Sequence, residues 1–278
     1  MNYYCYIAGL QEPQLDNTKS APTMADLTLQ LTALLSKSDL SLLNILRRQY
    51  DNQNLLTLQN NKDAEISPLG VLTHQDWMEI FEKIAESDSL NPPRDRRLLP
   101  YVLKYITATS QPDSNNNTTF KTDLLASLYY EYGLKSPNEF IRAWFEYNLN
   151  VGNILTALTC RKHNWDIRTA IVGDNLIANT IRNSTSVRDF NLKTEIDYFD
   201  QIAAISEIPD LLDRERRIDL LKWQWLERHT TFHYFSIEKI LAHYLRCQII
   251  HRWDNLSVEQ GTAIFRQMIN DLKKDVKF

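Results

Sequence analysis

The chain has 278 residues, of which 43% are hydrophobic and 24% are charged, a composition typical of globular proteins. Its formal net charge of -4 provides no general positive field for polyphosphate, so nucleic-acid binding is not expected. No apolar run approaches the roughly 18 to 20 residues that a membrane-spanning helix needs. Only six glycines are present, and neither G-x-G-x-x-G nor a P-loop motif occurs, which argues against the familiar nucleotide-binding folds.

The N-terminal segment, residues 3–10, is apolar and short, and it lacks the basic flank of a signal peptide. We expect it to be a buried strand or coil, so that the fold has a short N-terminal extended segment. The expected compartment is the cytoplasm. The three cysteines, Cys5, Cys160 and Cys247, lie far apart in apolar surroundings, which favours buried free thiols over disulfide bonds.

Helices are expected along most of the chain, because apolar residues recur at three- and four-residue spacing after residues that favour helix starts. Eight of them are predicted at about 26–36, 39–51, 75–86, 94–107, 120–132, 175–182, 194–205 and 210–227. Gly133 follows the fifth and is expected to end it.

Three further helices have the clearest start signals, at Ser136, Ser236 and Ser257. The first begins with a capping box, Ser136–Glu139, in which Pro137 takes the first helical position. An apolar stripe follows each start, as expected for a helix that packs against a core. The predicted fold class is therefore all-α.

Residues 109–119 are rich in turn formers and contain almost nothing to bury, so we expect an exposed, mobile loop there. This loop would separate an N-terminal helical part, residues 1–108, from a C-terminal helical part, residues 120–278, that forms one continuous unit.

An internal repeat relates residues 50–58 to residues 148–158. Each contains Asp or Asn, two intervening residues and then Asn-(Leu/Ile)-Leu-Thr, with Asn54 in the first copy and Asn153 in the second. A helix–turn–helix would explain this pattern if the first Asp or Asn capped the second helix. Such repetition indicates related helical units that build a scaffold surface.

Two carboxylates, Glu215 and Asp219, fall on nearly the same face of the predicted helix at 210–227. Carboxylates four residues apart repel each other, so a cation should lie opposite if they are buried. Arg161 and Lys162 are the candidates, in a structural ion-pair network. A catalytic acid pair or a metal site is the alternative interpretation.

His229 and His233 have the spacing of a helical zinc site, but no glutamate lies between them as in H-E-x-x-H and no third ligand is evident. We expect them to pack at a helix junction, and we expect no metal or other cofactor. Aromatic residues, including Trp225 and Tyr244, gather in the last quarter of the chain. Core packing is the expected role, and an exposed subset would mark an interface.

The sequence resembles the C subunit of V/A-type rotary ATPases, called subunit d in eukaryotic enzymes, at residues 153–162 and 171–173. The motifs Arg-Glu-x3-Asp-x5-Trp-Leu at 214–226 and Phe-Ser-Ile-Glu-x-Ile-Leu-Ala-x-Tyr at 235–244 resemble a bacterial family encoded beside V-type ATPase genes, a divergent relative of that subunit. The opening at 3–10 is similar to the start of the same family.

The resemblance implies pseudo-repeated helical bundles arranged as a socket for the central stalk, resting on the cytoplasmic face of the membrane rotor ring. It implies torque transmission, no active site and no small-molecule substrate. The last long helix differs from the family by carrying Arg252 and its neighbours where acidic residues are more usual. Two alternatives stay open: a helical enzyme that uses the carboxylates and histidines, and a generic helical scaffold.

Overall fold

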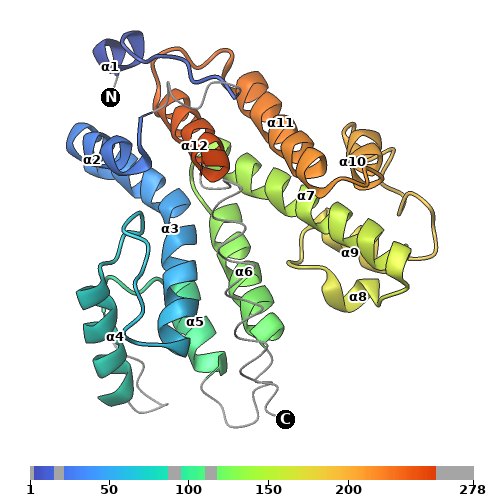
Figure 1. Cartoon of the computed structure of the whole chain (residues 1–278), viewed down its shortest axis with the longest axis horizontal. Coiled ribbons are helices and arrows are strands. Elements are labelled where there is room, and N and C mark those ends of the chain that lie inside the picture. Colours follow the sequence, from blue (N-terminus) through green and yellow to red (C-terminus); the bar gives the residue numbers. More distant parts are fainter. Residues whose placement is uncertain (1–2, 16–21, 87–94, 110–117, 255–278) are drawn as a thin grey trace, which may run out of the picture. The chain divides into compact units, whose positions relative to one another are not determined.

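The computed structural model describes residues 3–15, 22–86, 95–109 and 118–254. Within these ranges the chain forms twelve helices and no β-strand, so the predicted all-α class is confirmed (Figure 1). None of these helices is both long and apolar enough to cross a bilayer. The helices are α1 Tyr4–Ala8, α2 Met24–Leu34, α3 Lys37–Asn60, α4 His74–Glu86, α5 Pro100–Thr109, α6 Thr118–Leu134, α7 Glu139–His163, α8 Ile167–Ala170, α9 Leu176–Asn183, α10 Phe199–Ser206, α11 Leu211–Thr230 and α12 Ile237–Asp254.

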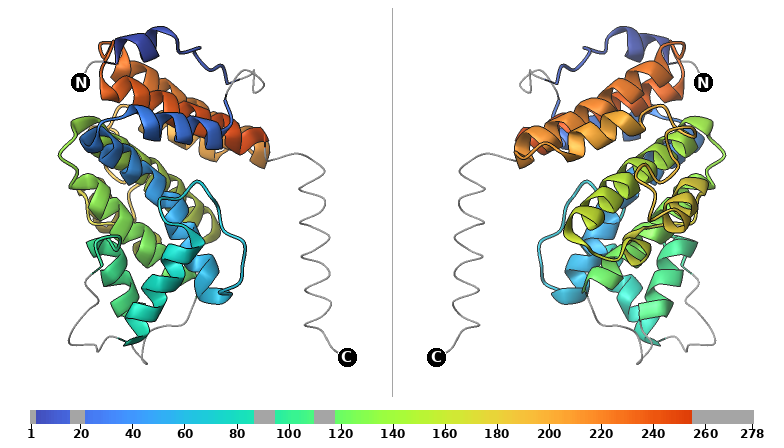
Figure 2. Two further views of the ribbon diagram at one scale, coloured as in Figure 1. Left: turned by 90° about the vertical axis from the view of Figure 1, so that its left-hand side faces the viewer. Right: turned by 90° about the vertical axis from the view of Figure 1, so that its right-hand side faces the viewer.

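The chain divides into two compact units. Unit 1 comprises residues 1–36 and 219–278, and unit 2 comprises residues 37–218, so the boundary falls within α11. In unit 1, α2 packs against α12, as the left view of Figure 2 shows. The predicted loop at 109–119 lies mostly outside the described residues, as does the predicted helix that starts at Ser257. The division into 1–108 and 120–278 therefore stays a prediction.

The first half of unit 2 is built from α3 to α6 around one apolar core. In α4, Trp77, Ile80, Phe81 and Ile84 recur at three- and four-residue spacing and face this core, which is the pattern of an amphipathic helix. Tyrosine hydroxyl groups tie the core to α3, because Tyr101 and Tyr105 donate to side-chain oxygens of that helix at 2.7 and 2.9 Å.

The second half of unit 2 is organised around α7, against which α8, α9 and α10 pack. The N-cap of α7 is Asn138, whose side chain accepts a hydrogen bond from the Ile141 N–H at 3.0 Å. The predicted start at Ser136 and Pro137 is therefore wrong by two residues. Asn138 has the extended backbone that a capping residue needs, whereas the Ser136 hydroxyl accepts from the Asn138 N–H instead.

Two predictions about the N-terminal segment, its extended conformation and its burial, are wrong. Residues Tyr4–Ala8 form a short helix and not an extended segment, and none of the five is buried. Cys5 is consequently exposed, whereas Cys160 and Cys247 are buried free thiols as predicted. The prediction failed because apolar composition alone does not show burial. A helix of little more than one turn can leave several apolar side chains at the surface.

Gly133 does not end α6, which continues to Leu134. Its role is to permit close packing, because a Cβ atom at this position would lie 2.0 Å from Cδ1 of Phe145 in α7. Gly152 lies within α7 and offers the opposite case, since nothing lies within 4 Å of the place where its Cβ atom would be.

Gly133→Ala should therefore destabilise unit 2 by about 1 to 3 kcal/mol or more through overpacking. Gly152→Ala is the matched control and should raise stability by about 0.5 to 1 kcal/mol, because alanine favours the helix more than glycine does. Urea denaturation followed by circular dichroism measures both changes. Equal effects of the two substitutions would contradict the packing role of Gly133.

Candidate functional site

Asn54 lies in the middle of α3 with only 3% of its surface exposed. Its amide group makes two hydrogen bonds to the backbone of one residue in the following loop: it donates to the Ser67 carbonyl at 3.0 Å and accepts from the Ser67 N–H at 2.9 Å. The side chain thus provides hydrogen-bond partners for the N–H and carbonyl of Ser67, which lies in a loop and has no helical partner for them.

Asn153 repeats this arrangement in α7, again 3% exposed. It donates to the Val172 carbonyl at 2.8 Å and accepts from the Val172 N–H at 3.0 Å. We call each set of paired bonds an asparagine clamp. The two clamps lie in the same compact unit, and each copy of the sequence repeat contains the asparagine of one clamp.

An arginine and a glycine accompany each clamp. Arg47 donates to the carbonyls of Leu69 and Gly70 in the first loop. Arg182 donates to the carbonyls of Ile171 and Gly173 in the second loop. Both loops therefore have their backbone carbonyls bound by a guanidinium group close to the clamped residue.

Each loop also needs its glycine. Gly173 has φ of +75°, in the left-handed region that side chains disfavour. A Cβ atom at Gly70 would lie 2.5 Å from the Asp51 carboxylate, so only glycine lets the chain pass so close to α3.

The residue one helical turn before each clamp also binds the loop. Asp51 pairs with Arg48 at 3.0 Å and accepts from the N–H groups of Val71 and Leu72, each at 3.0 Å. Asn150 occupies the equivalent place in α7 and accepts from the side chain of Asn175, the N-cap residue of α9, at 2.7 Å.

The predicted helix–turn–helix at the repeat is wrong, because Asp51 and Asn150 do not cap a helix. Both lie within long, uninterrupted helices and are buried. The repeat itself corresponds to two copies of one loop-binding arrangement. Burial explains the difference: a capping residue needs a free helix end, whereas these side chains reach sideways from a helix interior to a loop.

Replacing Asn153 with alanine should lower the free energy of unfolding by about 2 to 4 kcal/mol, because the N–H and carbonyl of Val172 would lose their partners. Asn54→Ala should have an effect of similar size. The control is Asn60→Ala, at an exposed residue in the last turn of α3, and its effect should stay within about 0.5 kcal/mol. A clamp variant as stable as this control would contradict the role given to the clamps.

Arg161 is bound locally and not to the predicted carboxylates. Its guanidinium donates to the carbonyls of Thr185, Val187 and Arg188 and lies 3.8 Å from the centre of the Phe190 ring. Burial lowers the pKa of this arginine from its usual value, although a guanidinium stays charged. Arg161 therefore holds the segment between α9 and α10, while Lys162 is exposed.

The cation at Asp219 is Arg252, which corrects the prediction that Arg161 or Lys162 would lie there. Asp219 is 2% exposed, and its carboxylate lies 2.8 Å from Arg252 Nη2 and accepts from the Trp253 indole N–H at 2.9 Å. All three residues belong to unit 1. Sequence spacing could not identify Arg252, because it reaches Asp219 from α12, more than thirty residues away.

The other candidate residues lie mostly in unit 1, where the aromatic ones pack in its core. Trp225 and Tyr244 are 5% and 0% exposed, as core packing predicts. His229 stacks on Trp225 at 3.8 Å between ring centres, and His233 follows the end of α11. Glu215 belongs to unit 2 and is half-buried. Among the described residues, no group of three or more histidine, cysteine or acidic side chains could hold a metal ion.

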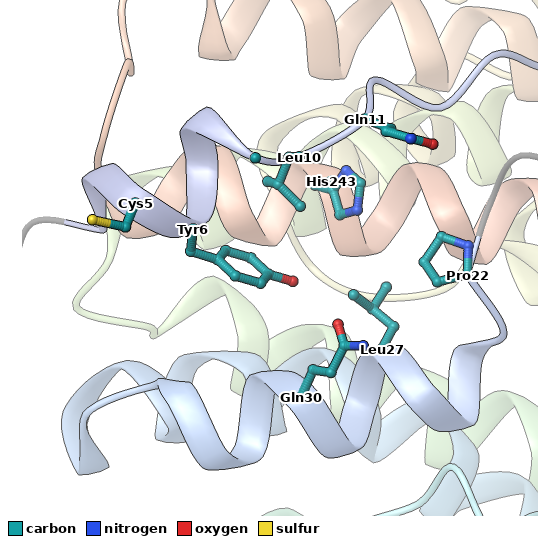
Figure 3. A pocket seen from close by; sticks show the side chains of 9 residues that line it. Cys5, Tyr6, Leu10, Gln11, Pro22, Leu27, Gln30 and His243 are labelled. Carbon is teal, nitrogen blue, oxygen red and sulfur yellow. The ribbon is translucent and has the colours of Figure 1, made fainter.

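Two cavities of unit 1 were not predicted. The larger has a volume of about 490 Å³ and lies between the N-terminal segment, α2 and α12 (Figure 3). The smaller has a volume of about 70 Å³ and lies between residues 7–13 and α12. Leu10 and His243 line both cavities, so these are neighbours.

The wall contributed by α12 carries buried polar side chains. His243 is 6% exposed, and its Nε2 atom lies 3.6 Å from Sγ of Cys247. Burial, together with the positive charges of Arg246 and Lys239, lowers the pKa of His243 to about 4, so the imidazole is neutral at pH 7. Burial raises the pKa of the Cys247 thiol to about 12, so this cysteine is protonated at pH 7.

His243 should make unit 1 sensitive to acid. Between pH 6.5 and about 4 the unfolded chain takes up a proton at this histidine and the folded chain does not, so stability falls as the pH falls through this window. The loss should approach about 3 kcal/mol and be absent in His243→Gln. Denaturation at several pH values measures it, with the exposed His74→Gln as a control that follows the wild type. Parallel curves for wild type and His243→Gln would contradict the assignment.

These features define the chain as an all-α protein with a repeated loop-binding arrangement in one unit and paired cavities in the other. The chain belongs to a family described as "Protein of unknown function (DUF2764)", which matches residues 1–276. No curated protein and no solved structure matches the chain.

Proposed function

We propose that this protein is a non-catalytic adaptor subunit of a V/A-type rotary ATPase, which links the central stalk to the membrane rotor ring and transmits torque. The observation that carries the proposal is the repetition of the asparagine clamp in unit 2, at Asn54 and Asn153. Pseudo-repeated helical bundles are what the resemblance to the C subunit implies, and the second clamp joins the two segments that carry that resemblance, 153–162 and 171–173.

The chemistry of the clamps also suits a part that transmits force. A long helix transmits torque only if the loops and helices around it do not slide when loaded. Paired amide–backbone bonds in a buried setting have defined directions and cost several kcal/mol to break together, whereas apolar contacts alone are non-directional. The clamps and their arginines would therefore keep the loops registered against α3 and α7.

In this proposal the protein is peripheral on the cytoplasmic face of the membrane, and it reaches the membrane only through the ring. The helical-enzyme alternative has less support, since Asp219 is bound by Arg252 and Trp253 and His229 is stacked on Trp225. A generic scaffold would share the same architecture and differ only in its partners, so the partners decide between the two.

The test is affinity purification of the tagged full chain from its native cells in a gentle detergent, followed by mass spectrometry. We expect the stalk and ring subunits of the ATPase to co-purify in constant ratio to the tagged chain. Asn60→Ala should recover the same subunits, whereas Asn153→Ala should recover fewer, because the clamped loop is released.

Native electrophoresis of the same membranes provides the decisive comparison. If the ATPase is present and intact but the tagged chain migrates separately from it, the adaptor proposal is wrong. Co-purification of soluble proteins alone would favour the generic scaffold.

A further inference from the structure

The smaller cavity of unit 1 concentrates charge in a confined space. Its apolar wall is formed by Ile7, Leu10, Pro13 and Ala242, and its polar wall by Glu12, Lys239, His243 and Arg246. Lys239 lies 3.3 Å from Glu12, whose side chain is 75% exposed. Because His243 is neutral at pH 7, the wall carries two positive charges and one negative charge.

Arg246 is the unusual member of this wall. It is only 5% exposed, yet its buried Nε atom has no hydrogen-bond partner among the described residues. Its described contact is with the Trp223 ring, whose centre lies 5.3 Å away. The carboxylates of Glu227 and Glu12 act on this guanidinium, but burial outweighs them and lowers the pKa of Arg246 from its usual value. Burial of such a charge costs several kcal/mol, and a cation–π contact returns only about 1 to 2 kcal/mol. An anion bound at this position would offset the remaining cost of burying the Arg246 charge.

The neighbouring larger cavity has the properties of a site for a small organic molecule. Its volume of about 490 Å³ falls within the range that such sites occupy. Leu10, Leu27 and Pro22 give it an apolar lining, and Figure 3 shows Tyr6 and Gln30 directing polar groups toward the space between them. Leu10 and His243 line both cavities, so the larger one adjoins the space beside Arg246.

We propose that unit 1 binds an amphipathic monocarboxylate, whose carboxylate pairs with Arg246 in the smaller cavity and whose body occupies the larger one. Lys239 is already paired with Glu12, and Glu227 also acts on Arg246, so the site suits one negative charge better than the two of a phosphate monoester. A guanidinium also matches the planar carboxylate with two parallel hydrogen bonds. The proposal is independent of the adaptor function, since it depends on unit 1 alone.

The first experiment is isothermal titration of the full chain with octanoate and, separately, with neutral 1-octanol. We expect octanoate to bind at least about tenfold more tightly than 1-octanol, because only octanoate can pair with the arginine. Octanoate should also change the tryptophan emission of the wild type, and this change should be absent in Trp223→Phe, since Trp223 stacks on the binding guanidinium. Equal binding of the two compounds, or no binding of octanoate below about 1 mM, would overturn the proposal.

The second experiment changes the cations. Arg246→Gln should lose at least about tenfold in octanoate affinity, whereas Arg168→Gln, at an exposed arginine of unit 2, should bind as the wild type does. If Arg246→Gln does not fold, Lys239→Gln replaces it, because this partly exposed lysine is not part of the core and its loss should still weaken octanoate binding several-fold. Unchanged affinity in the folded variant would overturn the proposal.

A carboxylate at Arg246 could come from a small molecule or from the C-terminus of a peptide. Titration with an N-acetylated apolar tripeptide, compared with the same peptide amidated at its C-terminus, separates these sources. Tighter binding of octanoate supports the small molecule. Tighter binding of the free-acid peptide, with no gain for the amide, assigns the cavities to a peptide terminus and overturns the small-molecule ligand.

Discussion

The architecture of unit 2 depends on one interaction, the pair of hydrogen bonds between a buried asparagine and the backbone of a loop. An isolated buried amide would be costly, and so would the unpaired N–H and carbonyl of the loop residue. Asn54 and Asn153 remove both costs at once, because a side-chain amide carries N–H donors and an oxygen acceptor on one planar group. The arginines, the glycines and the acidic or amide residue one turn earlier all act on the loops that these clamps position.

Most of the helices could be predicted from local chemistry, and the reasons are visible in the structure. The apolar spacing of α4 and the start of α12 after Ser236 are properties of neighbouring residues, so they can be read without knowing the fold. The N-terminal segment could not be assigned in this way, since eight apolar residues are too few to show a period. Asn138 competed with Ser136 as a cap, and the backbone conformation that decides between them is set by the tertiary structure.

The site was less predictable because its contacts join residues that are distant in sequence. The repeat revealed Asn54 and Asn153, but it could not reveal that their partners are Ser67 and Val172, whose backbone groups carry no sequence signal. Ion pairing at Asp219 could be predicted from its position, whereas its partner could not. The cavities required three separate segments to meet, and a buried arginine such as Arg246 has no distinguishing pattern of its own.

The clamps have a consequence for the exchange of backbone hydrogens with solvent. Loop amides normally exchange quickly, because water reaches them without any opening of the structure. The amides of Ser67 and Val172 are bonded to side chains that belong to helix interiors, so they are released only when α3 or α7 separates from its loop. The amides of these two loops therefore exchange with the same opening free energy as the helices beside them. Each loop and its helix behave as one cooperative element.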